Sequence, residues 1–263
     1  MVKLDNLVNV EKSEQTQFNR RAALRLFEKE IRIKRSLDML PTAKFESVLD
    51  AGCGVGGSSI WLAKNFRASV IGITLSIKQL KTARSLARKN KLEHLAKFHV
   101  RDFLNTKFPE ESFDVVWSIE SVCHAEEKKD FLKEAFRLLK RGGKIIVSDG
   151  FLKRDAMNER EREMVRKVTN GWAFPNFDKL DRFKKSLEEV GFKNIKCWDK
   201  TQEVLPSLNR IYTMCKIAYP IAKITEKLRI TSSILTKNNL AGTLIYDAMK
   251  MGLASYGVFY AEK

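Results

Sequence analysis

A glycine-rich segment between an apolar run and an amphipathic stretch is the strongest chemical signal in the sequence. Asp50 and Ala51 are followed by glycines at positions 52, 54, 56 and 57. Glycine lets a backbone turn sharply and approach a ligand closely, and the N-terminus of a following helix presents N–H groups to a ligand. The segment therefore predicts a loop that holds a small ligand where a strand ends.

The residues around the glycines indicate which ligand this is. Gly52, Gly54 and Gly57 match the spacing of dinucleotide sites, but such sites also use an acidic residue about 20 positions later to bind the ribose. Positions 51–92 contain no Asp or Glu. Asp50 instead precedes the glycines and would attract a cation. The pattern favours S-adenosylmethionine, which carries a sulfonium and an amino group and no phosphate, over NAD or a ligand-free turn.

Two further residues that could do chemistry follow another apolar run, at positions 113–118. Glu120 and His124 would lie at the carboxyl edge of a parallel sheet, where ligands bind. A carboxylate there could stabilise a developing cation or take a proton. We predict both as catalytic residues; the alternative for His124 is a polar residue at a helix start. No His, Asp or Glu cluster has metal-ligand spacing, so we predict no metal site.

Elements that could position these residues alternate along the chain. Apolar runs of strand length alternate with amphipathic stretches of helix length, which is typical of a parallel sheet covered on both faces. The expected strands are 47–50, 69–73, one ending near His99, 113–118, 144–148, 194–200 and 254–261, and the expected helices are 18–40, 58–66, 77–91, 128–139 and 177–190.

The chain divides into four predicted parts. Residues 1–40 form an N-terminal arm and helix, and residues 41–204 form a Rossmann-like cofactor-binding core. Residues 205–253 are too long for a hairpin connection and form a helical lid insertion. Residues 254–263 return to the core as its final strand.

Three motifs carry a family resemblance. They are the segments 48–59 (VLDAGCGVGGSS), 72–76 (GITLS) with Gln79, and 117–124 (WSIESVCH). With them the sequence resembles the class I S-adenosylmethionine-dependent methyltransferases, in the branch of the tocopherol and sterol C24-methyltransferases. The tail 245–253 (IYDAMKMGL) is similar to the tocopherol type. The resemblance implies a mostly parallel, seven-stranded sheet with an antiparallel last strand.

The resemblance also implies roles for individual residues. Asp50 and the glycine loop would hold the methionine end of the cofactor, and residues after the next strands would face its ribose and adenine. The implied cofactor residues are Asp50, Gly52, Cys53, Gly54, Gly56, Thr74, Leu75, Gln79, Asp102, Phe103 and Ile119. Independently of the resemblance, aromatic residues after the fifth expected strand and in the insertion are predicted to line the acceptor: Trp172, Phe174, Tyr212 and Tyr246. The alternative for them is a place in the core.

The composition and net charge of the chain limit its possible cellular location and binding partners. The chain has 263 residues, 44% of them hydrophobic, with a formal charge of +17. The four cysteines fit a reducing compartment, so we expect a cytoplasmic enzyme. The family resemblance implies an acceptor that is a small lipophilic molecule (terpenoid, sterol-like, prenyl or aromatic), methylated at carbon. The basic insertion would meet that acceptor at a membrane surface; the alternative is a folded cap with a solvated face. Alternatives are N- or O-methylation of a small natural product and, because of the charge, methylation of nucleic acid; Ser118-Ile119-Glu120-Ser121 argues against the last.

Overall fold

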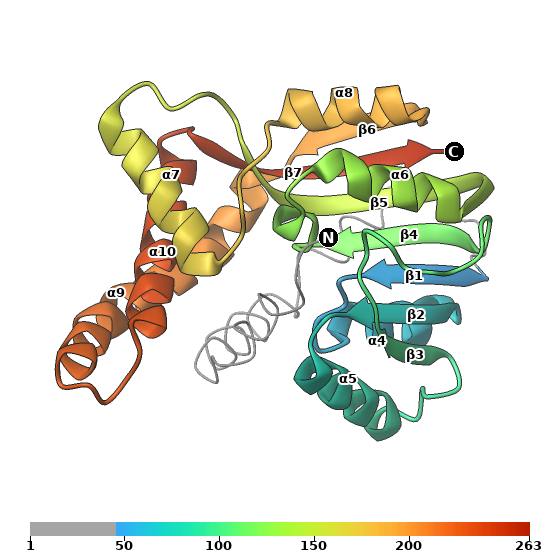
Figure 1. Ribbon diagram of the computed structural model, residues 1–263, viewed down its shortest axis with the longest axis horizontal. Helices are drawn as coiled ribbons and strands as arrows, with labels where there is room; N and C mark the ends of the chain where they lie inside the picture. Colours follow the sequence, from blue (N-terminus) through green and yellow to red (C-terminus); the bar gives the residue numbers. More distant parts are fainter. Residues whose placement is uncertain (1–45) are drawn as a thin grey trace. The chain divides into compact units, whose positions relative to one another are not determined.

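The computed structural model describes residues 46–263, which form two compact units (Figure 1). Of the described residues, the sheet unit holds 46–153 together with Pro175–Thr201 and Ser255–Lys263. The helical unit holds Arg154–Phe174 and Gln202–Ala254. The predicted arm and helix of residues 1–40 lie outside the described residues.

A seven-stranded sheet forms the first unit, in the order β3-β2-β1-β4-β5-β7-β6. Strands β3, β2, β1, β4 and β5 pair in parallel in this order, whereas β6 and β7 pair antiparallel. The predicted α/β fold class is therefore confirmed. The strands are β1 (Ser47–Ala51), β2 (Ser69–Thr74), β3 (Ala96–Val100), β4 (Phe113–Ile119), β5 (Leu139–Leu152), β6 (Lys193–Asp199) and β7 (Ala254–Glu262).

Helices cover both faces of this sheet, because the apolar strands present side chains to each side. On one face α4 (Gly57–Phe66) and α5 (Ile77–Lys89) pack their buried residues against the sheet. On the other face α6 (Lys128–Leu138) and α8 (Leu180–Val190) do the same. The strand order reverses between β1 and β4, so the carboxyl ends of these two strands flank the crevice in which open α/β sheets bind ligands.

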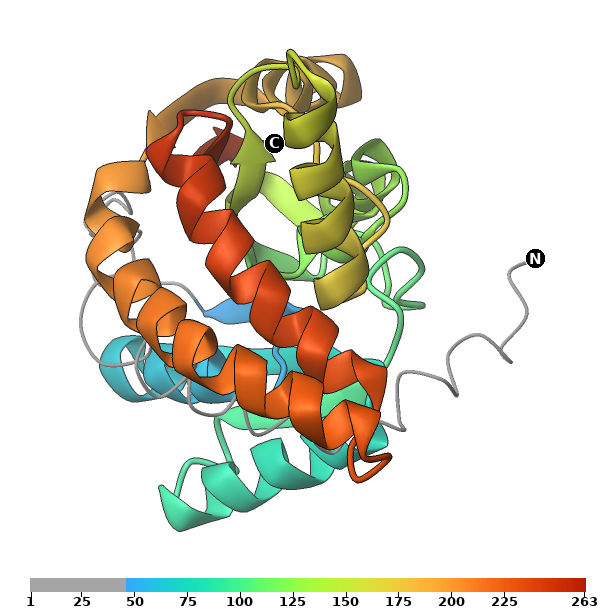
Figure 2. The same cartoon turned by 90° about the vertical axis from the view of Figure 1, so that its left-hand side faces the viewer.

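The helical unit contains α7 (Glu159–Trp172), α9 (Thr201–Lys227) and α10 (Ser233–Lys250) (Figure 2). Small residues let these helices approach one another. A Cβ atom on Gly171 of α7 would lie 2.6 Å from the Cβ atom of Ala241 on α10. A Cβ atom on Gly242 of α10 would lie 2.5 Å from the sulfur of Cys215 on α9. Side chains larger than hydrogen at either glycine would push the helices apart.

Helix α7 was not predicted from the sequence, and it makes the helical unit larger than the predicted insertion of residues 205–253. Half of its residues are charged, and Met164 and Val168 are the large aliphatic side chains that it buries. The start of the helix does carry a signal, because the side chain of Asn158 accepts a hydrogen bond from the backbone N–H of Glu161. Asn followed three positions later by Glu is a pattern typical of helix N-termini.

Each insertion of the helical unit leaves and rejoins the sheet unit through hydrogen-bonded neighbours. The first insertion is Arg154–Phe174 and the second is Gln202–Ala254. At the ends of the first, the N–H of Leu152 donates to the carbonyl of Asp178 at 2.8 Å. At the second, the N–H of Lys200 donates to the carbonyl of Tyr256 at 2.7 Å. The N–H of Tyr256 in turn donates to the hydroxyl of Thr201 at 3.0 Å. The points of departure and return are therefore fixed by the sheet unit itself.

Candidate active site

The glycine loop after β1 needs its glycines for two different reasons. Gly52, Gly54 and Gly56 all have positive φ angles, of 88°, 56° and 86°, which other residues adopt at a cost. A Cβ atom on Gly52 would also lie 2.3 Å from the Cβ atom of Ser121, whereas one on Gly54 would meet nothing within 4 Å. Gly52 is therefore needed for packing, and Gly54 borders open space that a ligand could fill.

Asp50 lies in strand β1, just before this loop. Its side chain is buried, and the hydroxyls of Ser58 and Ser59 both donate to its Oδ2 atom at 2.6 Å. Burial raises the pKa of the Asp50 carboxyl, and the two serine hydroxyls oppose that rise. The carboxyl group thereby joins β1 to the first turn of α4. Cys53 is buried too, and burial, with the nearby Asp50, raises the pKa of its thiol, which favours the neutral form.

The carboxyl end of β2 presents both polar and apolar groups. The hydroxyl of Thr74 donates to the Oε1 atom of Gln79 at 2.7 Å, which links the strand to the first turn of α5. Leu75, between them, is 47% exposed. Val100, which pairs with Thr74 at the end of β3, is exposed as well. Two exposed aliphatic side chains at one edge of the sheet offer a surface on which a flat ring could lie.

The residues after β3 form a tight turn. Asp102 is exposed, and its Oδ1 atom accepts the N–H of Leu104 at 2.8 Å. Phe103 is half-buried, and its ring packs perpendicular to that of Phe131 on α6 with the centroids 5.5 Å apart. The turn therefore holds a carboxylate at the surface beside an aromatic ring fixed by the core.

Glu120 directly follows β4 and has an unusual backbone conformation. Its φ angle is 51°, and its N–H donates to the carbonyl of Ser148 at 2.8 Å. A left-handed conformation in a residue other than glycine is a form of strain that is often found at functional sites. The side chain is exposed, as is that of His124 in the short 3-10 helix η1 (Val122–His124), while Ile119 is half-buried at the end of the strand.

Ser121 joins the two loops that carry the predicted site, and it was not predicted from the sequence. Its buried hydroxyl donates to the carbonyl of Ala51 at 2.6 Å and lies 2.6 Å from the hydroxyl of Ser118. Since Ala51 and Gly52 begin the glycine loop, these contacts set the position of Glu120 relative to that loop. The only signal in the sequence is a small polar residue beside Glu120.

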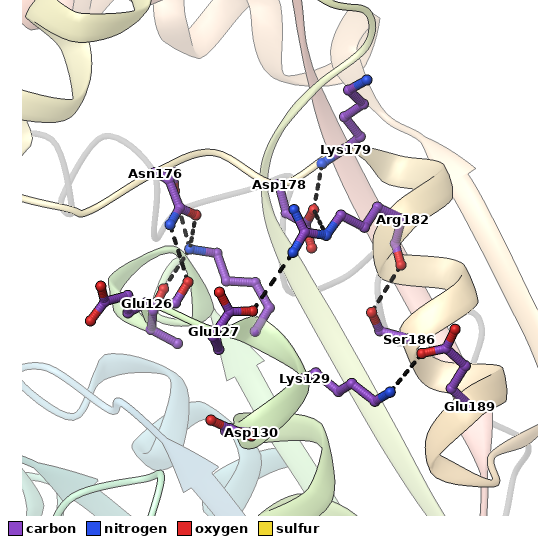
Figure 3. A network of polar contacts seen from close by, with 12 residues as sticks. Glu126, Glu127, Lys129, Asp130, Asn176, Asp178, Lys179, Arg182, Ser186 and Glu189 are labelled. Carbon is purple, nitrogen blue, oxygen red and sulfur yellow. Dashed lines mark hydrogen bonds and ion pairs between the residues drawn. The ribbon is translucent and has the colours of Figure 1, made fainter.

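A buried lysine holds the other side of the same loop. The Nζ atom of Lys128 donates to the carbonyls of Cys123 at 3.2 Å and Ala125 at 2.5 Å. It also donates to the backbone carbonyl and to the Oδ1 atom of Asn176, at 3.1 and 2.8 Å. The Nδ2 atom of Asn176 donates to the carbonyl of Glu126 (Figure 3). Burial lowers the pKa of the Lys128 ammonium, and nearby acidic groups oppose this shift.

Asp149, in strand β5, also holds the segment between β4 and α6 that carries Glu120 and His124. This buried carboxylate accepts the N–H of Cys123 at 2.9 Å and that of Gly150 at 2.8 Å. Burial raises the pKa of its carboxyl, and the backbone donors oppose the rise. Neither Lys128 nor Asp149 was predicted; the signal available for Asp149 was its place just after the predicted strand 144–148. Within residues 46–263 no group of three His, Cys, Asp or Glu side chains could hold a metal ion.

Comparison with known proteins gives the family. A family model described as "Methyltransferase domain" matches residues 49–147. The chain is 31% identical over 250 residues to a chloroplastic tocopherol O-methyltransferase of Arabidopsis thaliana, covering 93% of this chain and 71% of the relative. It is 34% identical over 238 residues to the 2-methyl-6-phytyl-1,4-hydroquinone methyltransferase of Synechocystis sp., covering 86% of this chain and 71% of the relative.

The chain belongs to the class I S-adenosylmethionine-dependent methyltransferases, in the tocopherol and sterol branch. A 24-methylenesterol C-methyltransferase of Oryza sativa subsp. japonica is 32% identical to it over 206 residues, which cover 75% of this chain and 56% of that enzyme. Both the predicted enzyme class and the predicted cofactor are confirmed.

Solved structures agree with this methyltransferase in fold. A geranyl diphosphate C-methyltransferase from Streptomyces coelicolor A3(2) has a TM-score of 0.68 at 22% identity and covers 88% of this chain and 74% of that one. A phosphoethanolamine N-methyltransferase of Haemonchus contortus has a TM-score of 0.70 at 20% identity, covering 88% of this chain and 52% of that one.

The four aromatic residues predicted to line the acceptor all belong to the helical unit of the methyltransferase. Tyr212 of α9 and Tyr246 of α10 lie against each other, with ring centroids 4.7 Å apart and planes inclined by 38°. Trp172 ends α7 and is half-buried, and Phe174 just after it is buried. The structure thus brings Tyr212 and Tyr246 together as a pair.

Proposed function

We propose that this enzyme transfers a methyl group from S-adenosylmethionine to a carbon atom of a small lipophilic acceptor that is terpenoid, sterol-like, prenyl or aromatic. The observation that carries the proposal is Glu120, an exposed carboxylate in a left-handed backbone conformation that Ser121 ties to the glycine loop. The names of the relatives support the acceptor class, because they include a tocopherol, a phytyl hydroquinone and a sterol methyltransferase.

The cofactor fits the groups that surround the glycine loop. The open space at Gly54 leaves room for the methionine end, which Asp50, Gly52, Cys53 and Gly56 would help to hold. The remaining cofactor residues in this proposal are Thr74, Leu75 and Gln79 for the ribose and one adenine face, Asp102 for the adenine amino group, and Phe103 and Ile119 beside the ring and the reacting end.

Glu120 would act on the acceptor. When bound, the cofactor supplies a methyl group activated by a sulfonium. As the electrons of an acceptor double bond form the new carbon–carbon bond, positive charge develops on the acceptor and the Glu120 carboxylate stabilises it. The same carboxylate, or His124, then takes the proton that restores the double bond.

O- or N-methylation is the second candidate. It is favoured by the tocopherol O-methyltransferase and by an ajmaline N-methyltransferase of Rauvolfia serpentina, which is 29% identical to this chain over 233 residues. For those acceptors Glu120 would act as a base toward a phenol or a protonated amine. Incubating cell extracts with the enzyme and cofactor labelled with a deuterated methyl group would show by mass spectrometry which atom receives the label.

The role of Glu120 is tested by substitution. Glu120→Ala should leave the affinity for S-adenosylmethionine unchanged and lower kcat by about 10²–10⁴-fold, the usual worth of a positioned acid–base group. Glu120→Gly should do the same while relieving the backbone strain, and should therefore raise the free energy of unfolding by about 1 kcal/mol. The control is Glu126→Ala, which removes an exposed carboxylate from the same loop.

A Glu120→Ala enzyme that turned over at the parent rate would remove the carboxylate from the reaction. His124→Ala would then show whether the imidazole carries it. Loss of cofactor affinity in Glu120→Ala would instead place the residue in the cofactor site.

We also propose that the enzyme works in the cytoplasm and meets its acceptor at a membrane surface. All four cysteines are free thiols, which fits a reducing compartment. No helix among the described residues is long and apolar enough to cross a bilayer.

A further inference from the structure

Helix α9 carries a row of large apolar side chains that residues 46–263 leave exposed. Ile217 is 65% exposed and Ile224 is 61% exposed. The same helix buries a different set of residues, among them Val204 and Ala222. We call the uncovered row the apolar stripe; its members are Met214, Ile217, Ile221, Ile224 and Leu228, the last just beyond the end of the helix.

The spacing of the apolar stripe places its members on one face. At about 100° per residue their directions fall within an arc of about 80°, and the hydrogen bond from Leu228 N–H to the Ile224 carbonyl, at 3.0 Å, continues that face past the helix. Lys216, Lys223 and Lys227 share a second, neighbouring arc and are all exposed. The helix thus presents the apolar stripe with a row of positive charges along one side.

This combination fits an anionic lipid surface. An amphipathic helix that lies in the interface inserts its apolar face and places lysines among the headgroups, and each lysine near an anionic surface strengthens the attraction. The formal charge of the whole chain, +17, acts in the same direction.

A second copy of the chain fits less well. In a coiled coil built on the stripe, charged residues of opposite sign should flank the seam and pair across it. No acidic residue occupies those flanking positions, which hold Thr213, Ala218, Pro220, Thr225 and Lys227.

We infer that the apolar stripe, with Lys223 and Lys227 beside it, is a docking surface for an anionic membrane. This deepens the proposed function, since a lipophilic acceptor is itself held in a bilayer. Binding to vesicles needs no acceptor, so the docking surface can fail while the methyl transfer stands, and the reverse.

Vesicle flotation with the full chain tests the inference. The wild-type protein should float with phosphatidylcholine vesicles that contain about one third phosphatidylglycerol, and should not float with pure phosphatidylcholine. The variant Ile217→Gln/Ile221→Gln/Ile224→Gln should lose this binding. Lys223→Gln/Lys227→Gln should weaken it by about 30-fold. Calorimetry with S-adenosylmethionine should give the parent affinity for both variants, which shows that they are folded.

Matched controls separate the stripe from general effects of polarity and charge. Met157→Gln/Met251→Gln replaces exposed apolar side chains of the helical unit outside the stripe, and Lys81→Gln/Lys184→Gln removes two exposed lysines of the sheet unit. Both controls should float like the parent. The inference is wrong if the wild type stays off the anionic vesicles, or if it floats equally with neutral ones. It is also wrong if the stripe variant floats like the wild type. It is wrong, too, if sedimentation velocity shows that the wild type forms a dimer without lipid and that the stripe variant does not.

Discussion

Replacement of Gly52 by alanine tests how tightly the two loops of the site are packed. The new Cβ atom would lie 2.3 Å from the Cβ atom of Ser121 and 2.7 Å from its Oγ atom. Ser121 cannot move away freely, because its hydroxyl is held at 2.6 Å from both the Ala51 carbonyl and the Ser118 hydroxyl. The clash must therefore displace the loop that carries Glu120.

The size of the effect follows from these contacts. A φ angle of 88° costs alanine about 1–2 kcal/mol. Overpacking a tight site adds about 1–3 kcal/mol, and a displaced Ser121 hydroxyl loses hydrogen bonds worth about 1 kcal/mol each. We expect Gly52→Ala to lower the free energy of unfolding by about 4–7 kcal/mol, a large part of the ~5–15 kcal/mol that stabilises most proteins.

Gly54→Ala is the matched control, because its Cβ atom would meet nothing within 4 Å. It should cost only about 1 kcal/mol of stability, yet weaken S-adenosylmethionine binding at least about tenfold by filling the open space that the cofactor needs. Urea denaturation followed by tryptophan fluorescence, with Trp117 buried in the sheet unit, and calorimetry with the cofactor measure the two effects. Equal stability of the two variants would refute the reasoning about Ser121.

Two other predictions concern charged groups. Lys128→Met leaves four oxygen atoms without their ammonium donor and should lower the free energy of unfolding by about 3 kcal/mol, whereas Lys129→Met, which removes only a surface ion pair, should cost less than about 1 kcal/mol; urea denaturation compares them. In the helical unit, Arg154 lowers the pKa of Glu161 from 4.5 to about 2, so its contribution to stability is present above pH 4.5 and is lost as the pH falls toward 2. A Glu161→Gln protein should show a flatter loss of stability over that pH range in denaturation curves.

The sheet unit could be predicted because its signals are local. A short, continuous apolar run indicates a strand buried on both faces. The glycines after β1 indicate a sharp turn, and three of them have positive φ angles in the structure. Helix α7 was missed because half of its residues are charged and it buries only two large aliphatic side chains, Met164 and Val168. Lys128 and Asn176 escaped for another reason. They meet across 48 positions of sequence, and neither residue type indicates that its partner is near.

The hydrogen-bonded ends of the two insertions affect how much the helical unit can change without disturbing the sheet unit. Since Leu152 is bonded to Asp178, and Lys200 to Tyr256, each insertion begins and ends at one place on the sheet unit. Lengthening such an excursion costs only about 0.6 kcal/mol for each doubling of its length, and it leaves the strand register unchanged. A change in the length or sequence of either insertion can therefore leave the sheet unit, and the glycine loop that it carries, in place.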